Sequence, residues 1–349
     1  GVGGASAVKV GREGGDVCQA PGFGGACRVG QSEAGIFRAG KLHVTNLVHI
    51  PENVYEGQNT WGTYVGTQSL GQNNRAAVID VQTNVVNDSD VPKTVTLTTQ
   101  IVDENGKVVA SDQQQQELAP HQAPSDVTPV FDQHLTVSGG DLHLWWPNGS
   151  LHNVPRAGDT GRPRPYMYKV FHTVSIDGAI VDAKQSTLGI RTITWDKSYP
   201  YVNGERIRAD GASGRYDYPA LGSSVPEEQQ WRDLQLFAAG GGNMWRPGHS
   251  SSSPEFVDAA DALGVFIIQP SGDGEGGFDK ECASKGDATA VSQCLYMRNV
   301  KREVHRDMVI RDRSHPSILA WETDNGSILN SFALELRALA AKWDDIAPR

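Results

Sequence analysis

The chain contains 349 residues, of which 38% are hydrophobic, and its formal net charge at pH 7 is -10. This length favours two domains over one, and the hydrophobic share is large enough for buried cores. The acidic balance and the lack of Lys/Arg runs argue against a nucleic-acid partner. No stretch reaches the ~20 apolar residues of a membrane helix. The chain begins with Gly1 and no signal-peptide pattern follows, so we expect the native start to be missing.

Residues 1–40 include 12 glycines and show no helical periodicity. We expect them to form a loop-rich tail of a preceding domain. From residue 41 to 190 apolar and polar residues alternate, as in AAVIDVQTNVV (76–86) and KTVTLTTQIV (93–102). This alternation predicts half-buried antiparallel strands, separated by tight-turn segments such as ENGK and IDGA. Several short strands at this spacing predict an immunoglobulin-like β-sandwich over residues 41–190.

After residue 190 short apolar strands alternate with amphipathic helices. The expected strands are 207–211, 243–249, 265–270 and 316–322, and the expected helices are 227–241, 253–264, 296–313 and 331–343. Strict alternation predicts a parallel sheet. Four strand–helix units are half of what an eightfold barrel of ~250 residues requires. Residues 191–349 are therefore expected to form half of a (β/α)8 barrel, with an open four-stranded sheet as the alternative.

The four cysteines form two local pairs, Cys18 with Cys27 and Cys282 with Cys294. Neither pair has the spacing of zinc or redox sites. Short loops closed by paired cysteines in a glycine-rich context are typical of disulfides formed in an oxidising compartment. We expect two disulfides in a secreted or periplasmic protein, and four free thiols in a cytoplasmic protein are the alternative.

Polar residues gather where the predicted parallel strands end, which is where such sheets place functional side chains. Arginine, histidine, carboxylate and amide groups at one rim suit a polyhydroxylated ligand. The residues expected at this rim are Asp210, Arg215, Arg246, His249, Gln269, Asp273, Glu322, Asp324 and Asn325. Trp245 and Trp321 could be platforms for sugar faces, and a place in the hydrophobic core is the alternative for both. Arg246 could instead bridge strands, and His249 could cap the helix that starts near Ser253.

A metal or cofactor is not expected. No histidine pair has HxxxH spacing. The glycine run AAGGGN follows a helix, which is the wrong order for a phosphate-binding loop.

Taken in order, several segments resemble glycoside hydrolase family 2, the group of β-galactosidases, β-glucuronidases, β-mannosidases and exo-β-glucosaminidases. The segments are AGIFRAGKLHVT, DLHLWWPNG, PYMYKVFHTV, STLGIRTI, YVNGERIRADG, GGGNMWRPGHSSSSPEFVDAADALGVFIIQ and RDRSHPSILAWETDN. The resemblance implies a jelly-roll tail over 1–40, the immunoglobulin-like β-sandwich over 41–190, and the first half of a (β/α)8 TIM barrel over 191–349. It also implies retaining hydrolysis of a terminal β-linked sugar.

By this resemblance, Arg246 matches a rim arginine and His249 matches a substrate-contacting histidine of some members. Asn325 matches the asparagine that directly precedes the acid/base glutamate. Residue 326 is glycine where that glutamate is expected, so the general acid is missing from its usual place. Asp324 or Glu322 could take over this role, and Asp324 lies closer to the expected position.

The leading hypothesis is a glycosidase acting on terminal β-linked sugars of oligo- or polysaccharides. A retaining mechanism needs two carboxyl groups ~5–5.5 Å apart, and the nucleophile would lie beyond residue 349, so this fragment alone is expected to be inactive. Because of Gly326, the alternative is a non-hydrolytic carbohydrate-binding or scaffold protein on a degenerate barrel. The sequence does not define the sugar, the linkage or the oligomeric state.

Overall fold

The computed structural model of the protein describes residues 42–54, 61–121, 130–155, 163–214, 218, 222, 224–272, 278–283, 286–347 and 349. The tail expected over 1–40, the Cys18–Cys27 pair, Arg215 and Asp273 lie outside these residues. By compactness the chain forms two units, of which the larger comprises Val44–Arg215 with Pro226–Arg349. The smaller comprises Gly1–His43 with Tyr216–Val225, and in it Tyr218 pairs with Gly222 in an antiparallel bridge.

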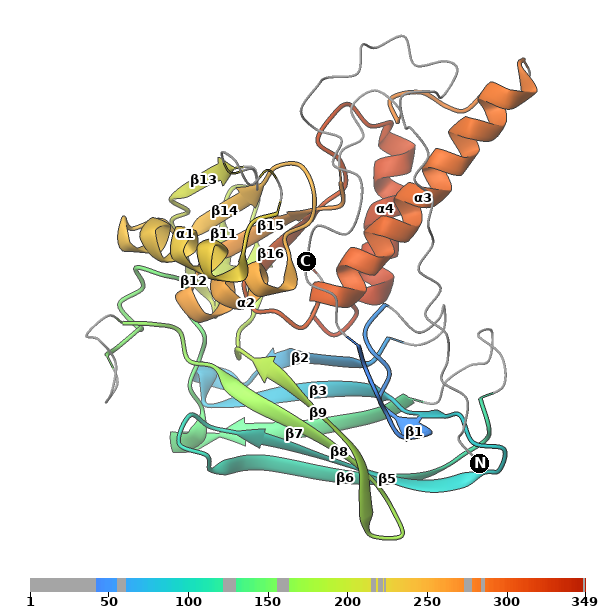
Figure 1. The fold of residues 1–349 in the computed structure, drawn as a ribbon. Helices are drawn as coiled ribbons and strands as arrows, with labels where there is room; N and C mark the ends of the chain where they lie inside the picture. The colour runs from blue at the N-terminus through green and yellow to red at the C-terminus, as the bar shows by residue number, and fades with distance from the viewer. Residues whose placement is uncertain are drawn as a thin grey trace. The chain divides into compact units, whose positions relative to one another are not determined.

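The first part of the larger unit is a sandwich of antiparallel sheets (Figure 1). One sheet has the order β2-β3-β7 and comprises β2 (Thr63–Leu70), β3 (Ala76–Asn84) and β7 (Val130–Ser138). The other has the order β6-β5-β8-β9 and comprises β5 (Lys93–Val102), β6 (Val108–Leu118), β8 (Tyr168–Ile176) and β9 (Ala179–Leu188). Two short strands, β1 (Val48–His49) and β4 (Val86–Asn87), pair with each other. The predicted sandwich is confirmed.

The sandwich core follows from the alternation in the sequence. In β5 the side chains of Val95, Leu97 and Ile101 are fully buried, whereas the residues on the other face of the strand are more exposed. Val81 of β3 and Val137 of β7 are equally buried in the facing sheet. Because successive strand residues point to opposite faces, one apolar row from each sheet is enough to fill the space between the sheets.

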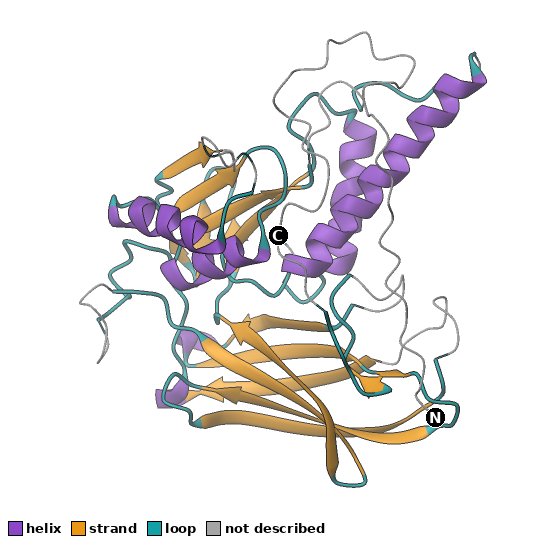
Figure 2. Ribbon diagram, in the orientation of Figure 1, coloured by secondary structure: helices purple, strands orange, loops and turns teal. Residues whose placement is uncertain are grey.

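The second part contains a parallel sheet whose strands follow the chain order β13-β14-β15-β16. These strands are β13 (Gly211–Gly214), β14 (Met244–Pro247), β15 (Phe266–Pro270) and β16 (Ile318–Glu322). The helices are α1 (Glu227–Ala239), α2 (Pro254–Leu263), α3 (Ala288–Asp312) and α4 (Asn330–Trp343). Figure 2 shows this alternation of strands and helices beside the all-strand sandwich. Unbroken chain order is that of a (β/α)8 barrel, so the predicted half barrel is confirmed.

Two of the predicted element boundaries are wrong. The first barrel strand was expected at 207–211 but runs over Gly211–Gly214, so Asp210 precedes this strand. Helix α3 begins eight residues earlier than expected, at Ala288, because the Asp287 carboxylate accepts a hydrogen bond from the Thr289 amide and caps the helix. The segment before β13 contributes instead to a small antiparallel sheet of β10 (Ile193–Trp195), β11 (Pro200–Val202) and β12 (Glu205–Arg206).

Helix α2 shows how local sequence fixes an element. The Ser253 hydroxyl accepts a hydrogen bond from the Phe256 amide, and Pro254 occupies the first helical position. Gly264 ends the helix in the left-handed conformation, at φ 73°. A side chain at Gly264 would also collide with the Asn148 backbone, 2.5 Å from the position of its Cβ. Ser253 itself is therefore the helix cap, a role considered for His249.

Side chains from the sandwich part seal the amino end of the parallel sheet. Trp145 and Trp146 pack in one buried cluster with Phe266 of β15 and Leu319 of β16. The buried Arg191 guanidinium donates to the backbone oxygens of Pro316 (2.7 Å) and Ile318 (2.9 Å). Side chains of the sandwich part therefore cover the amino ends of β15 and β16.

Within the described residues, no helix combines the length and the apolar character needed to cross a membrane.

Candidate active site at the carboxyl ends of the parallel strands

Three of the predicted site residues come together at the carboxyl end of the sheet. The Arg246 guanidinium, at the end of β14, donates hydrogen bonds to both carboxylate oxygens of Glu322, at the end of β16. Arg246 Nε lies 2.7 Å from Glu322 Oε2. Its Nη2 also donates to Asn325 Oδ1 at 2.9 Å. The two ion-paired side chains are 29% and 16% exposed, so a ligand can reach them. A two-pronged guanidinium–carboxylate pair fixes both groups in one plane.

Strand β15, which lies between β14 and β16, is hydrogen-bonded to the end of β16 and to the residue that follows it. Ser271, directly after β15, donates from its hydroxyl to the backbone oxygens of Glu322 (3.2 Å) and Thr323 (3.1 Å). The Ser251 hydroxyl donates to Pro270 O at 2.7 Å, which links the end of β15 to the segment after β14. Hydrogen bonds therefore connect the ends of three successive strands at this rim.

Asp324 is placed differently from Glu322, although only one residue separates them. Its side chain is 0% exposed and its Oδ1 lies 3.2 Å from the Lys301 ammonium, which is itself 5% exposed. The carboxylate is thus enclosed in a buried ion pair away from Arg246. Of the two predicted acid candidates, Glu322 has side-chain surface open to a ligand, and Asp324 has none.

The two predicted sugar platforms lie on the opposite face of the sheet. The Trp245 ring contacts Phe237 of α1 and Phe256 of α2, with ring centroids 5.1 and 6.4 Å apart. Trp321 packs against Met308 and Val309 in the layer between the sheet and the helices. Both are partly buried and pack toward the helices, close to the alternative of a place in the core. Each directly precedes a rim residue, so the alternation of strand faces turns it away from the rim.

Asp210 does not belong to the rim either. It precedes β13, at the amino end of the sheet, and its backbone amide donates to Asn243 Oδ1 at 2.8 Å. Its exposed carboxylate pairs with Arg208 at 3.0 Å. The prediction failed because it placed the first strand four residues too early. His249 follows β14 by two residues, at the carboxyl end, and is half-buried.

A polar layer lies behind the sheet and includes Gln269, which the sequence had placed at the rim. Lys301, His305, Met308 and Asp312 are all buried on one side of α3. Asp312 accepts hydrogen bonds from the fork of Arg311 and from Gln269 Nε2, the latter at 2.6 Å. The spacing of 4, 3 and 4 residues places these four residues on one helix face. Because that face is buried, the charged residues Lys301 and Asp312 could have been predicted to need oppositely charged partners.

One group of side chains among the described residues has the spacing of a metal site: Asp258, Asp261 and His315. His315 Nδ1 lies 2.7 Å from Asp261 Oδ2, and the other Asp261 oxygen accepts from the Ser317 amide at 2.9 Å. Burial opposes a charge on the ring, but the charge and hydrogen bond of Asp261 raise the pKa of His315 to about 9. In this structure His315 and Asp261 form an ion pair.

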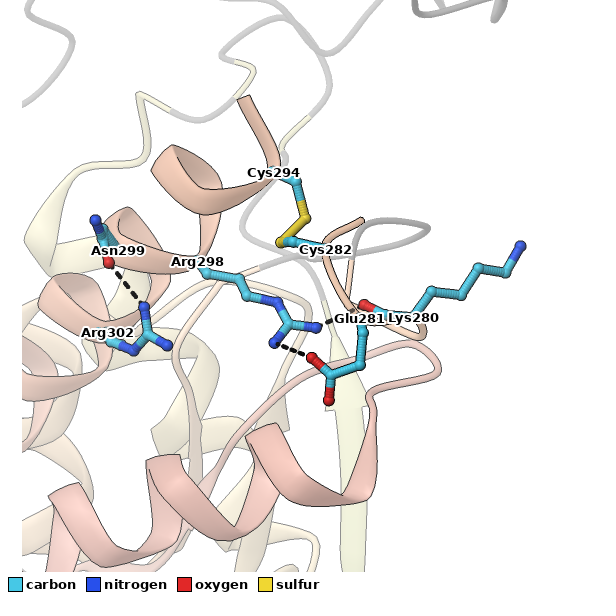
Figure 3. The surroundings of a disulfide bond; sticks show 7 residues. All are labelled: Lys280, Glu281, Cys282, Cys294, Arg298, Asn299 and Arg302. Atoms are coloured by element: carbon cyan, nitrogen blue, oxygen red, sulfur yellow. Dashed lines mark hydrogen bonds and ion pairs between the residues drawn. A yellow bond between two sulfur atoms is a disulfide. The ribbon is translucent and has the colours of Figure 1, made fainter. Parts of the chain in front are cut away.

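A disulfide joins Cys282 to Cys294 of α3, as predicted (Figure 3). One turn further along α3, Arg298 donates to the Lys280 backbone oxygen at 2.6 Å and pairs with Glu281 at 3.3 Å. These contacts hold segment 280–282, part of the connection between β15 and α3, against the helix.

Comparison with known families gives two matches that together span most of the chain. Residues 63–191 match glycosyl hydrolases family 2, and residues 194–348 match the glycosyl hydrolases family 2 TIM barrel domain.

Individual relatives are similar over nearly the same span. A β-glucuronidase of Formosa agariphila is 28% identical over 84% of this chain and 26% of its own length. A β-galactosidase of Bacteroides ovatus is 28% identical over 84% of this chain and 30% of its own length. The structure of a β-glucuronidase from glycoside hydrolase family 2 superposes with a TM-score of 0.71 at 26% identity, covering 87% of this chain and 28% of that one.

The chain thus spans less than a third of the length of these relatives. Its sandwich, its half barrel and both family matches agree in kind and in order. The chain belongs to glycosyl hydrolase family 2.

Proposed function

We propose that this chain is part of a β-glycosidase that cleaves terminal β-linked sugars, with the sugar bound at the rim formed by Arg246, Glu322 and Asn325. The observation that carries the proposal is the convergence of these three side chains at the open carboxyl end of the sheet. Relatives named β-glucuronidase and β-galactosidase support this substrate class. His249, at the same end of β14, is the fourth residue proposed to contact the sugar.

Glu322 is the proposed proton donor to the leaving glycosidic oxygen. In a retaining mechanism this proton transfer accompanies cleavage of the bond between the anomeric carbon and that oxygen, while a second carboxylate attacks the anomeric carbon. We expect that nucleophile from a strand outside this chain. Asn325 offers an amide to a sugar hydroxyl, and Gly326 leaves the usual position of the acid without a side chain.

The ion pair with Arg246 has a consequence for this role. Both carboxylate oxygens of Glu322 accept hydrogen bonds from Arg246, so neither can present a proton to the leaving oxygen while this pair is intact. The sugar must therefore draw Arg246 away from Glu322 before the acid can work. Hydroxyl or carboxylate groups of the substrate are the groups that could do so.

The test assays the enzyme that contains this chain on a panel of alkyl and aryl β-glycosides. Loss of a general acid costs typically 10²–10⁴-fold in rate, so we expect Glu322→Gln to reduce kcat within that range. The loss should be largest for alkyl and methylumbelliferyl leaving groups and small for dinitrophenyl, which departs without protonation. Glu335→Gln, an exposed helix residue paired with Arg302, is the matched control and should leave kcat unchanged.

A second function has its own support. Because both oxygens of Glu322 are occupied by Arg246 and residue 326 is glycine, a protein that binds sugar without cleaving it fits the same rim. Sugar binding measured by calorimetry, with no turnover on any glycoside, would favour that function. Equal rate losses for all leaving groups in Glu322→Gln would remove Glu322 from the acid role.

We also propose that the protein resides in an oxidising compartment, secreted or periplasmic. The Cys282–Cys294 bond supports this, since structural disulfides form and persist there. Mass spectrometry of the protein isolated from its native source with thiols blocked tests it, and a free Cys282 thiol would contradict it.

A further inference from the structure

Lys301 lies behind the rim, and its ammonium group is buried. Its side chain is 5% exposed. Its Nζ donates to Gly272 O at 3.0 Å, to Asp324 Oδ1 at 3.2 Å and to Ser271 O at 3.4 Å. Within the described residues these acceptors, one of them a carboxylate, compensate the buried charge.

The acceptors belong to two neighbouring strand ends. Ser271 and Gly272 directly follow β15, and Asp324 follows β16 by two residues. One ammonium from α3 therefore ties both strand ends together from below. The backbone amide of Ser271 also donates to Glu322 O at 3.3 Å. The ends of β15 and β16 are therefore joined by a direct backbone hydrogen bond as well as through Lys301.

This anchor lies between the two rim residues in the sequence. Glu322 and Asn325 contact Arg246 on the open side, and Asp324 points the other way to Lys301. In a segment this short, fixing the middle side chain fixes the direction of its neighbours. Displacement of Asp324 would turn Asn325 away from Arg246.

The helix that carries Lys301 is itself held in place at its exposed start. The Cys282–Cys294 bond and the contacts of Arg298 with Lys280 and Glu281 fasten it to the preceding connection (Figure 3). Phe278 of the same connection is 4% exposed and packs with Phe332 and Leu336 of α4. The support under Lys301 is therefore rigid on both the α3 and α4 sides.

We propose that Lys301 is a positioning residue, which sets Glu322 and Asn325 for the sugar by holding Asp324 and the end of β15. The inference rests on the proposed function and adds a residue that touches no substrate. A merely structural ion pair would change stability and leave the kinetics of the folded enzyme alone. A positioning residue changes the rate constant of folded enzyme, because an error of about 1 Å in placing a reacting group costs roughly 10²-fold.

The main variant is the double substitution Lys301→Met with Asp324→Asn, because it removes both charges and leaves no buried ion unpaired. We expect it to fold and to lose roughly 10- to 100-fold in kcat with a smaller change in KM. Arg302→Met, on the exposed side of the same helix, is the matched control with unchanged kcat.

A readout that needs no turnover separates this inference from the proposed function. Hydrogen exchange of the peptide covering 318–328 should rise in the double variant and stay at the parent level in Arg302→Met. If the parent enzyme cleaves no glycoside, the proposed function fails, and the exchange result still decides whether Lys301 holds the segment. A folded double variant with parental kcat and parental exchange overturns the inference.

Discussion

The sandwich and the half barrel stabilise their interiors by different means. In the sandwich, apolar rows such as Val95, Leu97 and Ile101 are buried between two sheets. Within each sheet, the backbone groups of neighbouring strands pair with each other. In the half barrel, charged groups are buried as well: Lys301 with Asp324, and Arg311 with Asp312. Antiparallel ladders satisfy the backbone by themselves, whereas parallel strands end in connections that side chains must hold. Buried pairs add little net stability but fix one arrangement. The difference teaches that the part carrying the site adds buried ion pairs to its apolar clusters.

The largest expected effect is the removal of a buried carboxylate from the half barrel. Asp344, which is 0% exposed, accepts from Tyr64 Oη at 2.6 Å, from Trp321 Nε1 at 3.0 Å and from Arg349 at 2.9 Å. Asp344→Ala leaves these donors unpaired, and breaking a buried pair costs about 3–5 kcal/mol in the free energy of unfolding. Urea unfolding measures it. The control is Asp345→Ala, its neighbour, and an equal loss in both variants would contradict the explanation.

A core truncation in the sandwich gives the matching apolar value. Leu97 is 0% exposed between the sheets, and Leu→Ala in a core costs about 2–5 kcal/mol. The same unfolding experiment applies to Leu97→Ala. A loss well below this range would contradict the explanation by apolar burial.

Two histidines, one in each region, should contribute to the pH dependence of stability in opposite directions. Burial, with Lys184 nearby, lowers the pKa of His172 in the sandwich to about 3, whereas Asp261 raises the pKa of His315 in the half barrel to about 9. For His172 the unfolded state binds the proton more readily, so stability falls as pH drops below ~6.5. For His315 the stability is fully present below ~6.5 and is lost as pH rises through 9.

The shift at His315 corresponds to about 3 kcal/mol at 1.36 kcal/mol per pKa unit. We expect the free energy of unfolding of the parent chain to fall by about this amount between pH 6.5 and pH 9. His315→Gln should remove that slope and leave the acid side unchanged. An unchanged alkaline slope in this variant would show that the ion pair with Asp261 contributes nothing.

A smaller effect is expected at the cap of α2. Ser253→Ala removes the acceptor of the Phe256 amide, and such a loss costs about 1 kcal/mol. It also removes the 2.5 Å hydrogen bond from Ser253 to Gln230 of α1, which adds to the loss. Ser253→Asp, which keeps a cap but not that donor, separates the two contributions. Unchanged stability in both variants would exclude the cap.

The smallest effect concerns the glutamine run of β6. Gln114 and Gln116 donate to the backbone oxygens of Asp132 (2.6 Å) and Val130 (3.2 Å) in β7, the edge strand of the other sheet. These side chains cover groups that would otherwise be open to another strand. Changing both to threonine should lower stability by about 1 kcal/mol at most and raise the rate of aggregation. Light scattering measures that rate, and the matched control is Gln113 with Gln115, which pair with threonines of β5.

The general position of the site could be predicted from sequence, but not which carboxylate occupies it. The alternation after residue 190 indicated parallel strands, and Arg246, Glu322 and Asn325 were expected at their ends. Trp245 and Trp321 were equally visible, but the face of a strand follows from its register, and β15 and β16 shift register between Ile267 and Ile268. Asp210 was misplaced because the boundary of β13 is set by pairing with β14, which no local pattern near residue 210 reveals.

The sequence alone determined the order of the two folds, because periodicity is a local property of the chain, and its segments resembled the family that the comparisons show. Only the tertiary structure decided that Glu322 faces an open rim while Asp324 is enclosed by Lys301. Those two carboxylates are chemically alike and one residue apart. Their difference arises from partners 76 and 23 residues away, Arg246 and Lys301, and contacts at such separations exist only after the chain has folded.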